Sequence, residues 1–487
     1  MKACRHFKGD RPCKYYWIDR SWNCFECEHH NPYSERILLI KLDALGDVVR
    51  STALAEGIKK KYPNCQLSWL TVKDAVYFVE SNPFVDRTLE YNTENVRRLQ
   101  FEKFDTIINL DKDPKSTSMM MSFNSEDKRG YGLSSEGHVV PLNDGSKYHY
   151  NICLDNYGGK TKNQKSYQQL IFEVAGLDYD NEKPFFELDS ERFKNFRESF
   201  LYIEDLIILN TGCGPVYPHK KWTYDGYNKL IKRLSKDSEC VVLLCGSKSE
   251  VELNKKLYDE NKSDSLINLT DNYSIEEFSY LIKMANVIVT GDTVALHIAI
   301  SLGTKIVSFF GPTPHQEVNL FGLGIKLFRE ELDCLNCYDQ FPCPYDGKCM
   351  SLIKSKKIFE NIGFGEKFPY RYDRRHDFKI VTSYKATDNI DLGITWVYGT
   401  GNAITLAQEK YVSYFSLDQI QYGYYNSLEH YDDYQRPIFK FSHFITVNLF
   451  DNDDLLPKIT YGQFIFNELL NQLKNLLPCL LFISKKH

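Results

Sequence analysis

The chain has 487 residues, a formal net charge of −5 and 14% aromatic residues, and its pI is about 6.2. This length accommodates two or three domains with sizeable cores. The slightly acidic balance excludes a global basic field, so no nucleic-acid partner is expected. No apolar segment typical of a signal peptide follows Met1, and the expected location is therefore the cytoplasm.

Apolar runs of strand length alternate with helix-length stretches in two parts of the chain. In the first part, strands are predicted at 36–42, 66–72, 85–91 and 104–111, and a helix at 47–61. After residue 200, strands are predicted at 205–210, 240–246, 265–270, 286–291 and 305–311, and helices at 223–236, 249–260, 274–284 and 293–302. The alternation predicts an α/β fold of two Rossmann-like, doubly wound domains that face a cleft.

Composition divides the chain further. The expected segments are a cysteine-rich start (1–35), a first Rossmann-like domain (36–200), a second Rossmann-like domain (201–330), a cysteine-rich segment with a closing helix (331–363) and a tail (364–487). In the tail, apolar and polar residues alternate with period two, and "ATDN" and "GTGN" are turn signals. The tail is therefore predicted to form antiparallel β-hairpins.

The first candidate site is "LDALGDVV", residues 42–49. Gly46 permits close backbone approach just past the first strand. Asp47 then opens a helix at the carboxyl end of the sheet, where open α/β folds bind ligands. It is either an acid favoured by the helix dipole or a general base that takes a proton from an acceptor hydroxyl. The helix N-terminus favours the ionised carboxylate, which suits a base.

The second candidate site follows the strand that ends at Gly291. Asp292 and Thr293 open a helix there, and the free N–H groups of a helix start suit a pyrophosphate. A carboxylate would repel phosphate, so we expect Asp292 to accept hydrogen bonds from sugar hydroxyls beside it. His297 lies about one turn further on, where a lone histidine is more often structural.

Two further strand ends carry charged residues. "NTGCGPVYPHKKW" (210–222) places paired lysines before Trp222, and Lys220 or Lys221 is a candidate to neutralise a diphosphate. The alternative is a solvated pair ahead of a helix. In "CGSKSEVE" (245–252), Glu250 either binds a ribose or caps the helix.

The cysteines form two groups, each with one C-x-x-C pair. The groups are Cys4, Cys13, Cys24 and Cys27, and Cys334, Cys337, Cys343 and Cys349. Four thiolates suit structural zinc or another thiophilic metal. The alternatives are reduced cysteines in irregular loops and disulfides. In each case the expected role is structural.

Three stretches together resemble glycosyltransferase family 9, the ADP-heptose:lipopolysaccharide heptosyltransferases and their relatives. They are "ILLIKLDALGDVVRSTALAEGIKKKYPNCQLSWLT", "HKKW" and "VTGDTVALHIAISLGTKIVSFFGPT". Their order and spacing carry the resemblance, which covers about residues 1–360. "GCGPVYP" departs from the threonine-rich turn of the family's best-known members.

The resemblance implies a GT-B fold and a metal-independent, inverting transfer from a nucleotide-activated sugar, with no catalytic cofactor. Residue by residue, it implies Asp47 as the base, Lys220 as the phosphate-binding lysine, Asp292 as the sugar-binding acid, Thr293 and Val294 as phosphate-binding amides, and His297 as the histidine of the same motif.

The expected function is transfer of a sugar, with heptose favoured, from a nucleotide-sugar donor, with ADP-heptose favoured, to a lipopolysaccharide core or related glycan. The acceptor is then lipid-linked, and peripheral contact with the cytoplasmic face of the inner membrane is expected. The alternative is a non-catalytic protein that binds a nucleotide-sugar or a glycan.

Residues 366–450 resemble a piece of a TonB-dependent outer-membrane receptor barrel. A lone fragment cannot close a barrel and leaves open strand edges. The tail is therefore expected to be a fusion or an assembly artefact without receptor function. The alternative is a β-rich accessory domain for acceptor binding.

Overall fold

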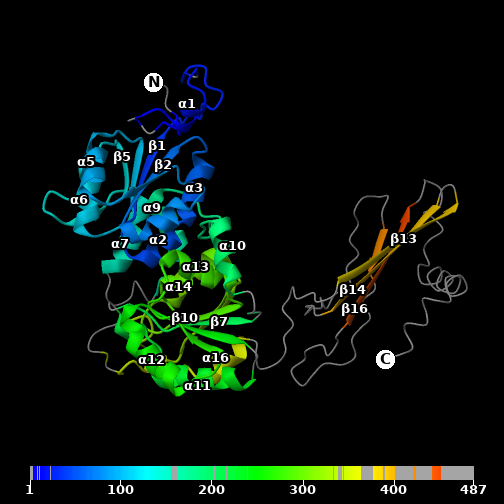
Figure 1. Cartoon of the computed structure of the whole chain (residues 1–487). Helices are drawn as coiled ribbons and strands as arrows, with labels where there is room; N and C mark the ends of the chain where they lie inside the picture. Colours follow the sequence, from blue (N-terminus) through cyan, green and yellow to red (C-terminus); the bar gives the residue numbers. More distant parts are fainter. Residues whose placement is uncertain are drawn as a thin grey trace, which may run out of the picture. The chain divides into compact units, whose positions relative to one another are not determined.

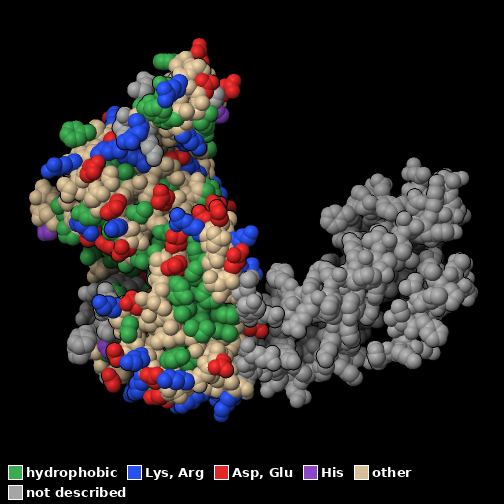
Figure 2. All heavy atoms as spheres, viewed as in Figure 1, with side chains coloured by type: hydrophobic (Ala, Val, Ile, Leu, Met, Phe, Trp, Pro, Cys, Tyr) green, Lys and Arg blue, Asp and Glu red, His purple; other side chains and the backbone are tan. Residues whose placement is uncertain are grey.

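The computed structural model describes residues 4–362, apart from 8, 10, 22, 155–161, 201, 202, 204, 215, 216, 238, 239, 333, 338–342 and 344, and four strands after residue 376. The chain divides into two compact units, Met1–Gly365 and Glu366–His487 (Figure 1). On the visible face of the first unit, acidic and basic side chains are interspersed, as Figure 2 shows. No large single-sign field covers that face.

The first half of the first unit is built on a six-stranded sheet with β1 (Arg36–Ile40) near its centre. Successive residues of β1 point to opposite faces. Ile37 and Leu39 join one buried cluster, whereas Leu38 and Ile40 join another. Burial on both faces explains the continuous apolar run of this strand.

The strands of this sheet follow the order β3-β2-β1-β4-β5-β6, and all neighbours are parallel except β5 and β6. Their bounds are β2 (Gln66–Thr71), β3 (Arg87–Glu90), β4 (Thr106–Asn109), β5 (Asp127–Leu133) and β6 (Val139–Pro141). The α-helices of this half are α2 (Leu45–Ser51), α3 (Ala53–Lys61), α4 (Val76–Glu80), α5 (Thr93–Phe101), α6 (Pro114–Ser122), α7 (Asp144–Leu154), α9 (Tyr167–Ala175) and α10 (Ser190–Glu198). The helix predicted at 47–61 is thus two helices that meet at Thr52.

The second half contains a second six-stranded sheet in which every pairing is parallel, in the order β12-β11-β10-β7-β8-β9. Its strands are β7 (Leu206–Asn210), β8 (Val241–Cys245), β9 (Leu266–Asn268), β10 (Val287–Gly291), β11 (Lys305–Phe309) and β12 (Gly324–Leu327). Its α-helices are α11 (Tyr224–Asp237), α12 (Val251–Glu260), α13 (Ile275–Met284), α14 (Val294–Leu302), α15 (Lys348–Ser351) and α16 (Ser355–Ile362). The two doubly wound sheets confirm the predicted α/β class.

The two halves meet where α2 packs against α14. Val49 and Phe78 of the first half share a buried apolar cluster with Leu296 and other residues of the second. Gly46 lies at this contact, because a Cβ added there would be 3.1 Å from His297 Cδ2. The glycine therefore lets the start of α2 approach α14 closely.

The cysteine-rich segments lie on different halves. The N-terminal one, with α1 (Lys14–Ile18), is anchored by Arg5, whose Nε donates to Asp86 Oδ1 at 3.0 Å. The second packs on the second half, since a Cβ added at Gly311 would lie 2.7 Å from Cys349 Sγ.

The second unit contains one antiparallel sheet in the order β13-β14-β16-β15. Its strands are β13 (Asp377–Thr387), β14 (Ile390–Thr400), β15 (Ile420–Gly423) and β16 (Phe441–Phe450). The remaining positions of the stretch 366–450 lie outside the described residues. In the described part of the chain, no helix has the length and apolarity needed to cross a bilayer.

Candidate active site

A cavity of about 1170 Å³ lies between the two halves of the first unit. Its wall contains all seven residues for which the sequence predicts a catalytic or donor-binding role: Asp47, Lys220, Glu250, Asp292, Thr293, Val294 and His297. Asp47 comes from the first half, and the other six come from the second. Two segments separated by more than 170 residues in the chain therefore meet at one site.

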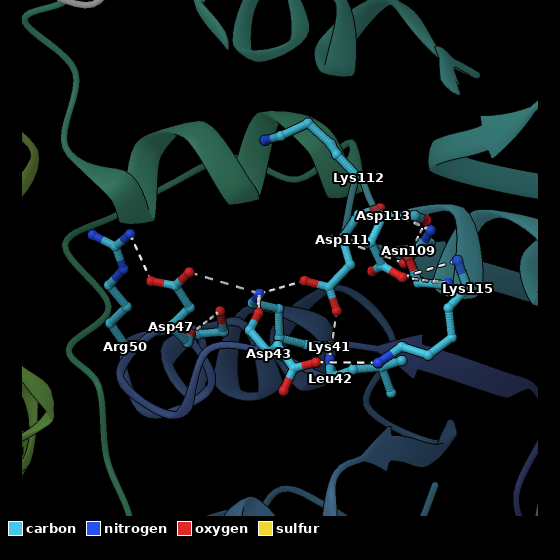
Figure 3. Close-up of polar contacts among 12 residues, drawn as sticks. Lys41, Leu42, Asp43, Asp47, Arg50, Asn109, Asp111, Lys112, Asp113 and Lys115 are labelled. Atoms are coloured by element: carbon cyan, nitrogen blue, oxygen red, sulfur yellow. Dashed lines mark hydrogen bonds and ion pairs between the residues drawn. The ribbon is translucent and has the colours of Figure 1, made fainter. Parts of the chain in front are cut away.

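Asp47 lies in the first turn of α2, directly after the loop that leaves β1. Its Oδ1 accepts from Arg50 Nη2 at 2.8 Å, and its Oδ2 lies 3.9 Å from Lys41 Nζ (Figure 3). Burial raises the pKa of Asp47, but the positive charges of Arg50 and Lys41 outweigh burial and hold this pKa well below its ordinary value. The carboxylate is therefore ionised at neutral pH.

Lys41 connects Asp47 to a deeper acid. The Lys41 ammonium, which is almost fully buried, pairs with Asp111 at the end of β4, and Asp111 also accepts from the Leu42 amide (Figure 3). Burial alone lowers the pKa of Lys41, but the Asp111 carboxylate more than offsets it, and the pKa lies above its ordinary value. Lys41 therefore remains charged beside the candidate base.

On the other wall, Lys220 Nζ lies 3.1 Å from Asp292 Oδ2. His297 Nε2 lies 3.7 Å from Asp292 Oδ1, which is too long for a hydrogen bond. Burial and the charge of Arg50 lower the pKa of His297 to about 4. The imidazole is thus neutral at physiological pH.

Helix α14 begins at this wall. Its N-cap, Thr293, has extended backbone angles and makes no side-chain capping hydrogen bond. The Thr293 hydroxyl instead accepts from Asn210 Nδ2 at 3.2 Å. The first amides of α14 lack an intrahelical partner, as at any helix start, and they open onto the cavity beside Lys220. The arrangement suits a diphosphate.

The structure separates the two lysines that the sequence left as alternatives. Lys220 pairs with Asp292, whereas Lys221 Nζ lies 2.7 Å from Glu250 Oε1. The Glu250 carboxylate also accepts from the amide of Ser247 and completes a capping box. Glu250 was expected either to cap the helix or to bind a ribose. The structure shows the capping contact, and the ribose contact stays a prediction.

The wall and supporting residues to which the sequence assigned no role include Lys41, Arg50, Asp111 and Glu317. Arg50 had a local signal, because it stands three positions after Asp47 on a predicted helix, where side chains are neighbours. Lys41 and Asp111 end adjacent parallel strands, but they are 70 positions apart, and only the strand order reveals their contact.

None of the eight cysteines predicted as metal ligands lines the cavity. Within the described residues, no group of three or more His, Cys, Asp or Glu side chains is arranged to hold a metal ion. Burial raises the pKa of Cys349 to about 11, and the nearby thiols of Cys334, Cys337 and Cys343 add to the rise. Metal binding by either cysteine group stays a prediction.

Two doubly wound sheets with a shared cavity form the GT-B architecture. A family model described as glycosyltransferase family 9 (heptosyltransferase) matches residues 93–345, just over half of the chain, and the chain belongs to this family. It is therefore a glycosyltransferase, as the sequence motifs predict. Asp47 precedes the matched residues, so its role does not follow from this match.

Individual relatives agree with the family. Lipooligosaccharide heptosyltransferase 2 of Haemophilus influenzae is 22% identical over 309 residues, which cover 58% of this chain and 84% of that protein. The family 9 glycosyl transferase of Veillonella parvula has a TM-score of 0.53 at 16% identity, over 68% of this chain and 97% of its own. The E. coli ADP-heptose lps heptosyltransferase II has a TM-score of 0.51 at 16% identity, over 67% and 97%. These two structures confirm the GT-B fold.

Proposed function

We propose that this protein transfers heptose from ADP-heptose to the core of lipopolysaccharide or a related glycan, with inversion at the anomeric carbon. The observation that carries the proposal is that one cavity brings together an ionised carboxylate, Asp47, with Lys220 and the start of α14. The names of the relatives supply the sugar and the class of acceptor.

In the proposed reaction, an acceptor hydroxyl attacks the anomeric carbon as the bond from this carbon to the diphosphate oxygen breaks. Asp47 accepts the hydroxyl proton. The electron pair leaves with the nucleoside diphosphate, whose negative charge is stabilised by Lys220 and by the first amides of α14. Asp292 accepts hydrogen bonds from hydroxyls of the transferred sugar. Attack on the side of the anomeric carbon away from the leaving diphosphate inverts the anomeric centre.

The deciding experiment compares Asp47→Asn with the wild type. The variant should lose about 10² to 10⁴ in turnover with ADP-heptose and a lipopolysaccharide-core acceptor, while its affinity for ADP stays unchanged. Asp144→Asn is the matched control, because Asp144 also lies in the first turn of a helix and pairs with a lysine three positions on, but it is exposed. Unchanged turnover in Asp47→Asn would remove Asp47 as the base.

The donor can be tested without an acceptor. Thermal unfolding of the wild type with ADP, UDP, GDP or CMP should show a stabilising shift with ADP, because a ligand that binds only the native state raises its stability. A shift without transfer to any acceptor favours the alternative, a non-catalytic nucleotide-sugar-binding or glycan-binding protein.

The proposed acceptor is lipid-linked, so we further propose peripheral contact with the cytoplasmic face of the inner membrane. Sedimentation with vesicles that carry the acceptor lipid tests this contact. Vesicles without the acceptor lipid distinguish recognition of the acceptor from adsorption to the bilayer.

We propose a structural metal, zinc or another thiophilic ion, at the second cysteine group, remote from the chemistry. Support comes from the sequence, which gathers four cysteines with one C-x-x-C pair between Cys334 and Cys349, a set of thiols that suits zinc. Elemental analysis of the purified protein and of Cys334→Ser tests it.

We further propose that the tail, residues 366–487, takes no part in transfer. A chain ending at residue 365 should then match the turnover of the full chain.

A further inference from the structure

Arg50 has an unusual set of contacts for a residue to which the sequence assigns no role. It follows Asp47 by three positions on α2, and its Nη2 donates to Asp47 Oδ1 at 2.8 Å. On its other side, the guanidinium carbon lies 3.5 Å from the centre of the Tyr167 ring, at the start of α9. A cation stacked this closely on an aromatic face is held in one orientation.

Tyr167 is itself fixed. Its ring is buried, and its hydroxyl lies 3.0 Å from Ser51 Oγ. The neighbouring Gln168 contributes a second tie, because its Nε2 donates to the Arg50 carbonyl at 3.3 Å. Helix α9 therefore holds both the backbone and the side chain of Arg50, and through Arg50 it restrains the Asp47 carboxylate.

The contact leaves the two oxygens of Asp47 in different situations. Oδ1 is occupied by Arg50, whereas Oδ2 lies 3.9 Å from its nearest cation, Lys41, beyond hydrogen-bonding distance. Lys41 is engaged by Asp111 instead. A general base needs one oxygen free to accept a proton, and this geometry selects Oδ2.

Arg50 also faces the donor wall. It lines the cavity, its Nε has no hydrogen-bond partner among the described residues, and the charges of Asp292 and Glu317 act on it. A donor diphosphate adds further negative charge near Asp47. Like charges favour protonation of a carboxylate, and a base that becomes protonated is inactive. A cation fixed against Asp47 opposes this effect.

We propose that Arg50 is a positioning residue for the transfer reaction: it directs Oδ2 of Asp47 toward the acceptor hydroxyl and keeps Asp47 ionised when the donor diphosphate is bound. The inference rests on the proposed function. Other charged or titratable groups lie around Asp47 and Arg50, on several elements: Lys41, Asp74, Lys112, His149, Tyr167, Asp292, His297 and Glu317.

The test compares Arg50→Gln and Arg50→Lys with the wild type in transfer assays across pH. Arg50→Gln should lose about tenfold or more in kcat from misplacement, and the acid limb of its kcat profile should move upward by about one pH unit or more. Arg50→Lys retains the charge but not the planar fork, so its acid limb should stay near that of the wild type while kcat is intermediate. Arg97→Gln, at an exposed position of α5, is the matched control and should overlay the wild type.

Two further measurements distinguish failure of this inference from failure of the proposed function. The Kd for ADP should change less than about twofold in Arg50→Gln; a rise of tenfold would make Arg50 a donor-binding residue and overturn the proposal. Carboxyl-carbon NMR of aspartate-labelled protein, with the Asp47 signal assigned by its loss in Asp47→Asn, follows the base without any transfer. If the wild type transfers no sugar, the proposed function fails. The NMR titration of Asp47 does not depend on transfer, so it still tests whether Arg50 keeps Asp47 ionised. An Asp47 titration that is identical in wild type and Arg50→Gln overturns it.

Discussion

Lys220 Nζ lies 3.1 Å from Asp292 Oδ2 at the start of α14, so the cation proposed for the diphosphate is paired with the acid proposed for the sugar. Both side chains are largely buried. When the negatively charged diphosphate binds, Lys220 can exchange the carboxylate for phosphate oxygens, and Asp292 becomes available to accept from sugar hydroxyls. The pair thus holds both groups in place for the donor.

Replacing Lys220 with alanine should weaken ADP binding by about 10- to 100-fold, the effect of losing one or two hydrogen bonds to a charged group. Isothermal titration with ADP measures this change. Lys229→Ala removes a lysine that forms an exposed pair with Asp225 on α11, and it should bind ADP as the wild type does. Equal affinities in all three proteins would contradict the assignment of Lys220 to the diphosphate.

Much of this site could be predicted because its parts follow strong strand signals. The apolar runs of β1 and β10 are each followed by a helix. Asp47 lies in the first turn of α2, and Asp292 comes just before Thr293, the N-cap of α14. By contrast, β5 has the sequence "DKRGYGL", which lacks an apolar pattern, and the sequence analysis missed it. Gly130 explains its composition: φ is +93°, and an added Cβ would lie 1.9 Å from Asn109 O. Close backbone approach, rather than side-chain burial, determines that part of the strand.

The pairing of Lys41 with Asp111 could not be predicted for a different reason. Each residue follows its own strand. Lys41 stands within a family motif, but nothing in the sequence pairs it with Asp111. Contact between them depends on β1 and β4 being neighbours, and strand order is not visible in the period of the apolar residues. The same limit hid the contact of Arg50 with Tyr167, because α2 and α9 are more than 110 residues apart in the chain.

The buried pair of Lys41 and Asp111 makes a stability prediction. Asp111→Asn leaves a buried ammonium without its carboxylate, and breaking such a pair costs about 3–5 kcal/mol. Urea unfolding monitored by circular dichroism measures the free energy of unfolding. The exposed Asp144→Asn variant should unfold at the wild-type midpoint. A wild-type midpoint for Asp111→Asn as well would show that the pair contributes little to the fold.

The close approach at Gly46 predicts that a larger side chain there disturbs the junction of the two halves. An alanine Cβ would lie 3.1 Å from His297 Cδ2 and 3.5 Å from the Cα of Val294. His297 is buried and cannot swing away freely, so α2 must shift by a few tenths of an ångström. Because Asp47 is the next residue, Gly46→Ala should lower kcat about tenfold with little change in ADP affinity. Steady-state kinetics and titration with ADP separate the two effects. Unaltered kcat would mean that the junction absorbs a methyl group without moving Asp47.

The lowered pKa of His297 predicts that the stability of the fold depends on pH. Its pKa is lowered from 6.5 to about 4 in the folded protein, first by burial and then by the charge of Arg50. Between these values the unfolded state binds more protons than the folded state, so the free energy of unfolding falls as pH falls through this window. The expected loss from this group between pH 7 and pH 4 is about 3 kcal/mol.

Urea unfolding of His297→Gln at the same two pH values tests the origin of this loss. The variant cannot gain the proton, so its stability should fall less than that of the wild type over the interval, by about 3 kcal/mol. His138→Gln, at an exposed position, serves as the control and should retain the full wild-type pH dependence. If His297→Gln also retains it, other acid-sensitive groups, such as the partly buried His149, account for the loss, because desolvation also lowers the pKa of His149 well below its ordinary value.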